Sequence, residues 1–295
     1  MFLGSPRFAV PSLAALLKAG HDIALVVTQP DRPAGRGQKT RPSAVSAYAH
    51  AHGLEVWQTS SLKGGEARLR AIGPEAMALA AFAALVPTPI LDLAPLGILN
   101  VHPSLLPRWR GAAPIQAALL AGDTDTGVSI IRLIPALDAG PILLQQSIAI
   151  GPEDDYLSLE QKLAELGARL VVQALAENPP ERPQDDSLAT YCRRIEREDG
   201  RIDWTSSAQT IWRQVRAYRG WPQAFTTWNG KVLKVLRATP TQGAGEPGMV
   251  DTTSVVGTGE GRLRLDEVVL EGRKPQSGEE LRRGYPQLVG AKLGE

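Results

Sequence analysis

The pattern of apolar and polar residues divides the chain into two regions. From Ser5 to about Asn178, short apolar runs alternate with segments whose apolar residues follow a helical spacing. This alternation predicts a parallel sheet with helices on both of its faces. The expected strands cover 23–28, 76–83 and 96–101, with a further apolar run at 128–134. The expected helices cover 12–19, 43–52, 87–93, 112–120 and 157–176.

The second region follows a segment that breaks every apolar period. Residues 179–190 begin with three prolines in five positions, which predicts a linker. Beyond it, 206–218 has the pattern of one amphipathic helix. Short alternating runs separated by glycine turns then cover 224–228, 231–238, 254–258 and 262–270, and such runs predict a small β-barrel. We therefore expect two domains, residues 1–178 and 191–295.

Composition narrows the functional classes. The chain has 295 residues, of which 43% are hydrophobic and 21% charged, as in a globular protein with a full core. The net charge of +1 means that nucleic-acid binding would depend on local patches. The single cysteine, Cys192, has no companions at metal-ligand spacing, so we expect no metal and a reducing, cytoplasmic setting. No signal peptide or long apolar run is visible, so no membrane partner is expected.

Nucleotide cofactors are not expected either. The first strand-to-helix turn reads Gly4-Ser5-Pro6-Arg7-Phe8. It lacks the second and third glycines that allow a backbone to approach a pyrophosphate. A Walker lysine motif is also absent. These observations argue against binding of NAD and of ATP.

Three polar residues are candidates for catalysis. Asn100 and His102 are two positions apart at the end of the expected strand 96–101, so their side chains should project to the same side. Asp138 follows the apolar run 128–134 and precedes a glycine turn. Taken singly, each is most often an ordinary turn or strand-end residue. Together they offer an amide donor, an imidazole and a carboxylate at a sheet edge where α/β proteins bind ligands.

The sequence around these residues resembles a known enzyme family. Asn100-Val-His102 is followed by Ser-Leu-Leu-Pro-Arg-Trp-Arg-Gly at 104–111 and by Leu-Asp-Ala-Gly at 137–140. This block resembles the formyltransferases that use 10-formyltetrahydrofolate as cosubstrate. In that family Asn, His and Asp at these places form the catalytic set, which implies Asn100, His102 and Asp138 here. The resemblance also implies a Rossmann-type fold for the first domain and an OB-like barrel for the second.

The family's chemistry suggests a role for each of the three residues. Formyl transfer gives a tetrahedral intermediate with negative charge on oxygen, so the site needs hydrogen-bond donors and a route for a proton. We expect Asn100 to donate to the formyl oxygen and His102 to supply a second donor and, when protonated, a charge. Asp138 would orient the imidazole and help to relay the proton from the attacking amine.

The resemblance places the folate against two segments. The expected contacts are Phe82, Ala83, Leu85, Ser104, Leu105, Leu106 and Pro107. For the two leucines of 104–107, plain core packing is the alternative. The family usually has Tyr-Gly where this chain has Phe82-Ala83, and commonly has Gly at the position of Pro103. Family members also usually have a few residues ahead of the first strand, and a misassigned start codon would explain the short beginning here.

The continuation of the block, 107–116, most resembles the family members that formylate initiator methionyl-tRNA for translation initiation. Those members insert a basic segment near the acceptor stem, and the connection 28–42 resembles it, with Arg36 at the place of the family's key arginine. The expected tRNA contacts in this connection are Arg32, Arg36, Lys39 and Arg41. By itself, such a stretch is most often a solvated loop.

The second region adds further basic residues. Residues 191–295 contain 17 Lys and Arg against 13 Asp and Glu. Arg213 and Arg216 are three apart on the expected helix, and we expect them to contact phosphates. A purely structural role for these arginines is the alternative.

Other acceptors fit the sequence less well. A family member that formylates glycinamide ribonucleotide would share the catalytic set but would not need the basic connection or the second domain. One that formylates a sugar nucleotide carries a second domain but has no use for the basic connection. A non-catalytic RNA-binding module would not need the intact Asn, His and Asp set. We expect a monomeric enzyme with methionyl-tRNA and the folate as its partners.

Overall fold

The computed structural model describes residues 1–34 and 39–295. These residues form two compact units. The first contains Met1–Pro114, Asp125–Ala149 and Glu160–Cys192. The second contains Ile115–Thr124, Ile150–Leu159 and Arg193–Glu295. The last segment of the first unit therefore ends at Cys192, whereas the sequence analysis placed the end of the first domain at residue 178.

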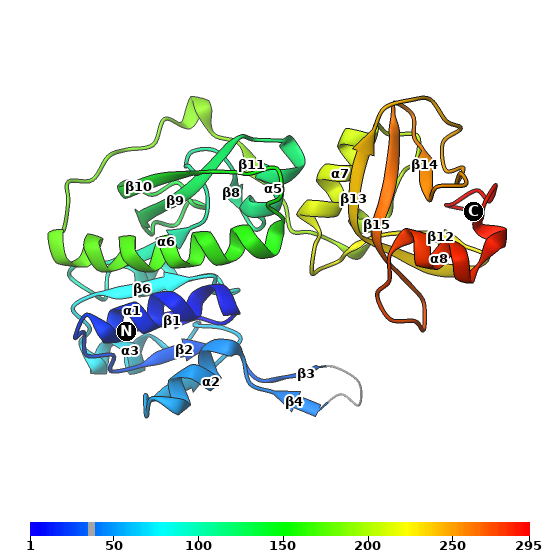
Figure 1. Ribbon diagram of the computed structural model, residues 1–295. Helices are drawn as coiled ribbons and strands as arrows, with labels where there is room; N and C mark the ends of the chain where they lie inside the picture. The colour runs from blue at the N-terminus through cyan, green and yellow to red at the C-terminus, as the bar shows by residue number, and fades with distance from the viewer. Residues whose placement is uncertain (35–38) are drawn as a thin grey trace. The chain divides into compact units, whose positions relative to one another are not determined.

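A seven-stranded sheet forms the centre of the first unit (Figure 1). Its strands, in spatial order, are β10 (Ile142–Ala149), β9 (Asp125–Arg132), β7 (Ile98–His102), β6 (Met77–Ala80), β1 (Phe2–Gly4), β2 (Val26–Thr28) and β5 (Val56–Gln58). The strands from β7 to β5 are parallel, which confirms the predicted α/β class.

Two strands of this sheet differ from the prediction. β9 runs antiparallel to β7, and β10 runs antiparallel to β9, so the sheet is mixed and not fully parallel. The connection between β9 and β10 is too short to hold the crossover of a dozen or more residues that a parallel pair needs. The alternation of apolar runs does not carry this information about strand direction.

The helices of the first unit lie close to their predicted positions. They are η1 (Arg7–Ala9, a 3-10 helix), α1 (Val10–Lys18), α2 (Ala44–Ala51), α3 (Glu66–Ile72), α4 (Thr88–Leu91) and most of α6 (Tyr156–Glu177). The sequence analysis did not predict α3, β5 or β10. Leu69 of α3 and Ile90 of α4 join Leu3, Val27 and Leu79 of the strands in one buried cluster. One face of the sheet is therefore covered by α3 and α4.

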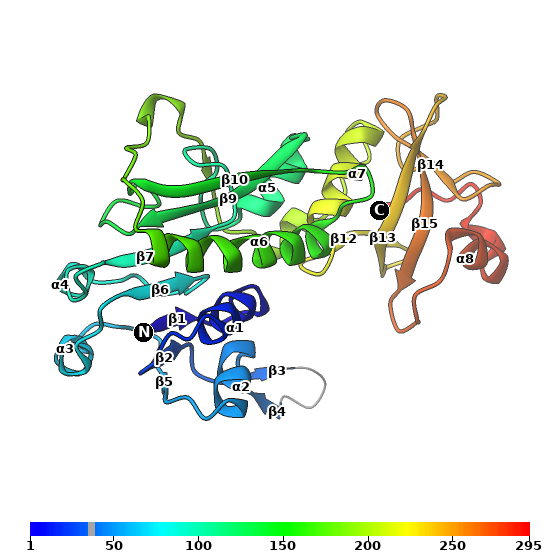
Figure 2. The same ribbon diagram turned by 60° about the vertical axis from the view of Figure 1, so that its left-hand side comes forward.

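The long helix α6 packs very closely on the other face (Figure 2). A Cβ atom added at Gly167 would lie 2.4 Å from Val101 Cγ1, so no side chain fits there. Successive residues of a strand point to opposite faces. Because Val101 faces α6, its neighbours Asn100 and His102 face the opposite side of the sheet.

The basic connection of the first unit contains a short hairpin. β3 (Arg32–Ala34) and β4 (Lys39–Arg41) pair antiparallel, where the sequence predicted an irregular loop. The hairpin leaves the carboxyl end of β2, and its base is closed by a 2.7 Å hydrogen bond between the hydroxyls of Thr28 and Ser43. β2 and β7 are three strands apart in the sheet, so their carboxyl ends are separated by roughly 14 Å.

Residues that follow α6 return along the first unit. Arg182 exchanges backbone hydrogen bonds with Ile142, and η2 (Asp186–Leu188) follows. β11 (Tyr191–Cys192) then pairs in parallel with β8 (Arg110–Gly111). The segment predicted as a linker is thus hydrogen-bonded to the first unit, next to the candidate catalytic sequence.

The second unit is built on an antiparallel sheet. Its order is β12 (Ala224–Trp228), β13 (Lys231–Thr241), β15 (Arg262–Leu270) and β14 (Val255–Gly257). Asn229 and Gly230, with φ of 48° and 70°, form the tight turn between β12 and β13, as their sequence favours. The bounds of β12 and β15 equal those expected from the alternation. The C-terminal β domain is confirmed as an antiparallel sheet.

Helices complete the second unit. α7 (Ala208–Ala217) buries Ile211 and Val215 in the core of the unit, and α5 (Pro114–Ala121), η3 (Arg197–Gly200), α8 (Gly278–Gly284) and η4 (Pro286–Leu288) are its other helical elements. The sequence reading missed α8, although Ser277 and Glu280 form the capping box that begins it. Among the helices of the described residues, none is long and apolar enough to cross a membrane.

Candidate active site

The three candidate catalytic side chains meet at the carboxyl end of β7. Asn100 Nδ2 lies 3.5 Å from Asp138 Oδ1, and His102 Nδ1 lies 3.7 Å from the same oxygen. All three residues are buried, with 7%, 4% and 9% of their surface exposed in sequence order. The strand supplies two of them by its alternation, and the turn after β9 supplies the carboxylate. The arrangement places an amide, an imidazole and a carboxylate in contact.

Asp138 is held in place from two directions. Its Oδ2 atom accepts a 2.9 Å hydrogen bond from the backbone N–H of Gly111 in β8. Its backbone carbonyl accepts a 2.8 Å hydrogen bond from the side-chain amide of Gln184. The residue has a φ of 47°, a left-handed conformation that costs a residue with a side chain about 1 to 2 kcal/mol. These contacts were not predicted, because they join residues far apart in the sequence.

His102 has a protein partner on each side of its ring. Its Nε2 atom lies 3.0 Å from the backbone carbonyl oxygen of Trp109. A carbonyl can only accept a hydrogen bond, so Nε2 carries the proton of the neutral ring and Nδ1 presents its lone pair to Asp138. Burial lowers the pKa of His102 below its ordinary value, although the nearby Asp138 carboxylate opposes this shift. At neutral pH the imidazole is therefore uncharged and can accept a proton.

A tight turn carries the chain from β7 into the segment 104–107. The N–H of Ser104 donates to the carbonyl of His102 across Pro103, with a distance of 2.9 Å. Such a three-residue turn needs no N–H at its centre, and the φ of proline suits it. Ser129 of β9 then accepts from the N–H of Leu106 and donates to the carbonyl of Ser104. Proline at position 103 is compatible with this backbone.

Some of the expected folate contacts are packed inside the first unit. Ser104 is fully buried, and its hydroxyl donates to the carbonyl of Arg108. Leu106 forms a buried cluster with Ile131 and Ile142, and Leu105 packs against Gly127. The alternative of core packing thus describes Leu106, whereas Leu105 and Pro107 are half-buried and remain partly accessible to a ligand.

The other expected folate segment follows the carboxyl end of β6. Phe82 is buried in the core cluster beside α3 and α4, whereas Leu85 has 90% of its surface exposed. Ala83 is not among the residues with positive φ, so its backbone does not require the glycine that the family usually has. The exposed Leu85 lies in the loop that follows β6, the neighbour of β7 in the sheet, and is available to an apolar ring.

Comparisons with known proteins identify the family of this chain. The family model described as formyl transferase matches residues 1–175, and the model of its C-terminal domain matches residues 194–286. The chain belongs to the formyl transferase family. The resemblance seen in the sequence is thereby confirmed.

Full-length relatives and solved structures extend the comparison. The chain is 45% identical to the methionyl-tRNA formyltransferase of Dechloromonas aromatica, over 99% of this chain and 98% of that protein. It is 46% identical to that of Gluconacetobacter diazotrophicus, again over 99% and 98%. The structure of methionyl-tRNA formyltransferase from Clostridium thermocellum has a TM-score of 0.57 at 15% identity, covering 81% of this chain and 91% of that one.

A second solved structure gives the same fold. The N-formyltransferase of Helicobacter canadensis, in complex with folinic acid and dTDP-3-aminofucose, has a TM-score of 0.66 at 19% identity. The match covers 89% of this chain and 96% of that chain. The fold thus occurs both in a methionyl-tRNA formyltransferase and in an N-formyltransferase that binds dTDP-3-aminofucose.

The predicted tRNA contacts of the hairpin are only partly described. Arg36 lies outside the described residues, and for Arg32 and Lys39 the structure describes the backbone strands but not the side chains. Arg41, at the end of β4, is exposed. The hairpin starts from the same edge of the sheet as the candidate catalytic residues Asn100 and His102.

The two arginines of α7 are engaged within the second unit. Arg216 donates to the backbone carbonyls of Asp154 and Gly151, at 2.5 and 2.7 Å, and stacks over the ring of Trp212. The guanidinium of Arg213 lies directly over Gly122, where an added Cβ would be 2.2 Å from Arg213 Cζ. These contacts favour the structural alternative for Arg216, since two of its three side-chain nitrogens already donate to backbone carbonyls.

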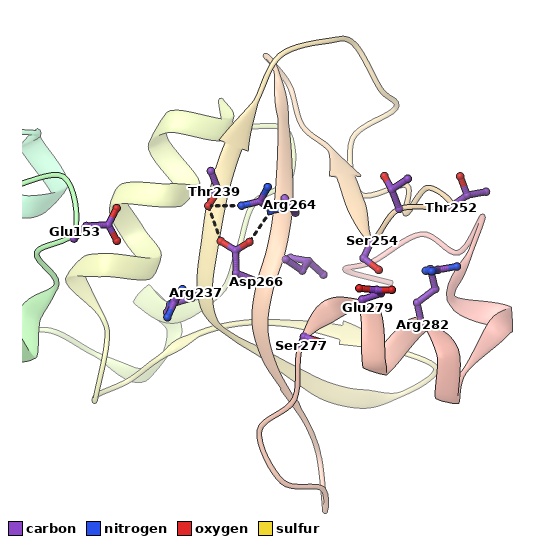
Figure 3. Close-up of a pocket in the computed structure, with 12 residues that line it drawn as sticks. Glu153, Arg237, Thr239, Thr252, Ser254, Arg264, Asp266, Ser277, Glu279 and Arg282 are labelled. Atoms are coloured by element: carbon purple, nitrogen blue, oxygen red, sulfur yellow. Dashed lines mark hydrogen bonds and ion pairs between the residues drawn. The ribbon is translucent and has the colours of Figure 1, made fainter.

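A separate cavity of about 640 Å³ lies in the second unit (Figure 3). Its lining includes three positively charged residues, Arg237, Arg264 and Arg282, and three negatively charged residues, Glu153, Asp266 and Glu279. Arg264 is paired with Asp266 at 2.7 Å, and the carboxylate of Asp266 also accepts from Thr239. The charges of this cavity cancel, so it has no marked preference for an anion or a cation.

Proposed function

We propose that this chain transfers the formyl group of 10-formyltetrahydrofolate to the amino group of initiator methionyl-tRNA, for translation initiation in the cytoplasm. Residues 1–178 would form the catalytic domain and 191–295 an OB-like tRNA-binding domain, with 179–190 between them, in a monomeric protein. The observation that carries the proposal is the buried contact of Asn100 and His102 with one oxygen of Asp138. Full-length identity to relatives named for this activity supports the choice of acceptor.

Asn100 is the best donor for the oxygen of the transferred formyl group. Negative charge develops on that oxygen when the amine attacks, and a buried, preoriented amide N–H stabilises such charge more strongly than water does. Asp138 orients this amide through its contact with Nδ2. Both ring nitrogens of His102 face protein partners, so the structure favours Asn100 over His102 as the donor.

His102 and Asp138 would transfer the proton from the attacking amine to the folate nitrogen. The attacking amine must lose a proton, and the folate nitrogen must gain one, for the formyl group to change partners. The lone pair of His102 Nδ1 faces Asp138 Oδ1 at 3.7 Å, so the imidazole can accept the proton of the amine beside a carboxylate that attracts the resulting charge. The protonated imidazole can then pass this proton on to the folate nitrogen.

The folate would lie across the carboxyl ends of β6 and β7. Leu85 offers an exposed apolar side chain to the flat ring, and the half-buried Leu105 and Pro107 offer further apolar surface close to the catalytic residues. Ligand sites of this kind combine apolar walls with a few placed polar groups. The buried Phe82, Ser104 and Leu106 would support this surface from the inside.

The acceptor stem of the tRNA would approach over the basic hairpin. A stem presents closely spaced phosphates, and arginine and lysine side chains bind them by charge and hydrogen bonds. The hairpin leaves the sheet on the catalytic edge, roughly 14 Å from β7, which is a short distance for a stem whose terminal aminoacyl group must reach Asn100.

The salt dependence of kcat/KM with methionyl-tRNA tests this assignment. We expect kcat/KM to fall steeply with salt, and Arg36→Ala to flatten the slope of its logarithm by roughly 0.7 to 0.9, the value for one phosphate contact. Arg70→Ala, which removes an exposed arginine from α3, is the matched control and should leave the slope unchanged. The affinity for the folate should not change in either variant.

Equal slopes and activities for the wild type and Arg36→Ala would contradict a role of the hairpin in tRNA binding. Transfer to glycinamide ribonucleotide or to an aminosugar nucleotide, with none to methionyl-tRNA, would overturn the proposed acceptor and keep the proposed chemistry.

A further inference from the structure

The side-chain amide of Gln184 connects two parts of the active site. Its Nε2 atom donates to the backbone carbonyls of Asp138 and Gly140, at 2.8 and 2.7 Å. Its Oε1 atom accepts from Nε and Nη2 of Arg110, at 3.0 and 2.8 Å. An amide side chain has two N–H donors and an oxygen with two lone pairs, so every hydrogen-bonding position of Gln184 is used.

Arg110 determines which way this amide points. Its side chain is only 3% exposed, and a buried guanidinium needs acceptors for its N–H groups. Nη2 also donates to the carboxylate of Asp186 at 2.7 Å. Because Arg110 can only donate, it requires the oxygen of Gln184 on its side and so directs the NH₂ group towards the Asp138 turn.

The Asp138 turn requires such support. Asp138 has a φ of 47°, and a strained backbone of this kind persists only when its surroundings hold it. Gln184 bridges the carbonyls at both ends of the three-residue turn 138–140. The next residue along from Arg110, Gly111, binds the Asp138 carboxylate through its N–H. The backbone of the Asp138 turn is thus held by Gln184, in the segment before β11. The carboxylate of Asp138 is held by Gly111 of β8.

We propose that Gln184 is a positioning residue of the reaction: oriented by Arg110, it holds the Asp138 turn so that the carboxylate faces Asn100 and His102. This inference rests on the proposed function, in which Asp138 acts in formyl transfer. It assigns a task in the active site to the segment before β11, which the sequence alone describes only as a connection.

Amide hydrogen exchange tests the positioning without reference to catalysis. Gln184→Met keeps the length of the side chain and adds no charge, but removes both hydrogen bonds to the turn. We expect the Gly111 N–H, which reports on the Asp138 carboxylate, to exchange at least about tenfold faster in this variant, while the amide of Val101 in the sheet centre exchanges as in the wild type. If Gln184 only stabilised the fold, Gln184→Met would accelerate the exchange of both amides alike.

Gln214→Met is the matched control. Gln214 also donates through Nε2 to two backbone carbonyls, those of Asp199 and Arg201, at 2.8 and 2.9 Å, but it lies in the second unit. This variant loses the same number and kind of hydrogen bonds and should leave the exchange of Gly111 unchanged.

Kinetics provide the second test. We expect Gln184→Met to lower kcat by about tenfold or more with both KM values changed less than about threefold, because the effect acts on the geometry of the reacting groups. In the Asp138→Ala background the same substitution should cause no further loss of kcat, since it acts through Asp138.

The outcomes separate the two proposals. Unchanged Gly111 exchange in Gln184→Met, or a kcat loss that multiplies with that of Asp138→Ala, would overturn the positioning role. If the wild-type protein did not transfer a formyl group to methionyl-tRNA, the proposed function would be overturned. The exchange experiment would still test whether Gln184 holds the Asp138 turn. If Gln184→Met fails to unfold cooperatively, Gln184→Glu keeps the volume and an acceptor for Arg110, and unchanged exchange and kcat in it would equally refute the inference.

Discussion

The charge of Asp138 gives the most direct prediction of the site. In Asp138→Asn the new side chain can keep its oxygen towards the N–H of Gly111, 2.9 Å away in the native protein, and turn its NH₂ group towards His102 Nδ1. That NH₂ group would donate to the lone pair of the imidazole. The size of the side chain is thus retained, but the imidazole loses its negative partner, its nitrogen becomes occupied, and the amide of Asn100 loses the oxygen that orients it.

The distance sets the size of the effect. Two unit charges 3.7 Å apart attract each other by about 4 kcal/mol when the effective dielectric constant is about 20. If this attraction stabilises the protonated imidazole in the transition state, its loss lowers kcat by roughly 1000-fold, because each 1.36 kcal/mol corresponds to a factor of about ten.

Single-turnover formylation of methionyl-tRNA at saturating folate measures this rate. Asp92→Asn, which changes an exposed aspartate in the same unit, is the control for the loss of one negative charge. Thermal unfolding and the KM for the folate should remain close to the wild-type values. A rate for Asp138→Asn within about threefold of the wild type, in a folded protein, would refute the idea that the Asp138 charge acts on His102 during the reaction.

Three further predictions concern the same unit. Asn100→Ala should fold normally and lose roughly 100- to 1000-fold in turnover, and turnover near the wild-type value in a folded variant would remove it from the mechanism. Because burial lowers the pKa of His102, the unfolded chain takes up a proton that the folded protein does not, so stability is lost as the pH falls below the ordinary value of 6.5. His102→Gln should therefore show a shallower fall of the unfolding free energy below that pH in denaturant titrations, and equal slopes would contradict the shift. Gly167→Ala should cost roughly 1 to 3 kcal/mol in the same assay, because its Cβ would lie 2.4 Å from Val101, while Gly284→Ala in open space should be neutral or stabilising.

The sequence alone determined the features that depend on residues near one another in the chain. The alternation over 224–228 and 262–270 gave the bounds of β12 and β15, because a strand shows its period of two directly in its own residues. The same alternation placed Asn100 and His102 on one side of β7. The block from Asn100 to Gly111 indicated the family, and it did so before any contact was known.

Only the tertiary structure decided the features that depend on pairing between distant segments. The direction of β9 and β10 follows from which edges meet, and an apolar run has the same pattern in either direction. Gln184 and Asp138 are 46 positions apart, so nothing in either local sequence reveals that one supports the other. Helical spacing suggested that Arg216 faces phosphates, but spacing does not show whether a guanidinium is already bound to the carbonyls of a neighbouring loop. Local pattern determines the elements and the candidate residues, whereas packing determines which of their polar groups are left for a substrate.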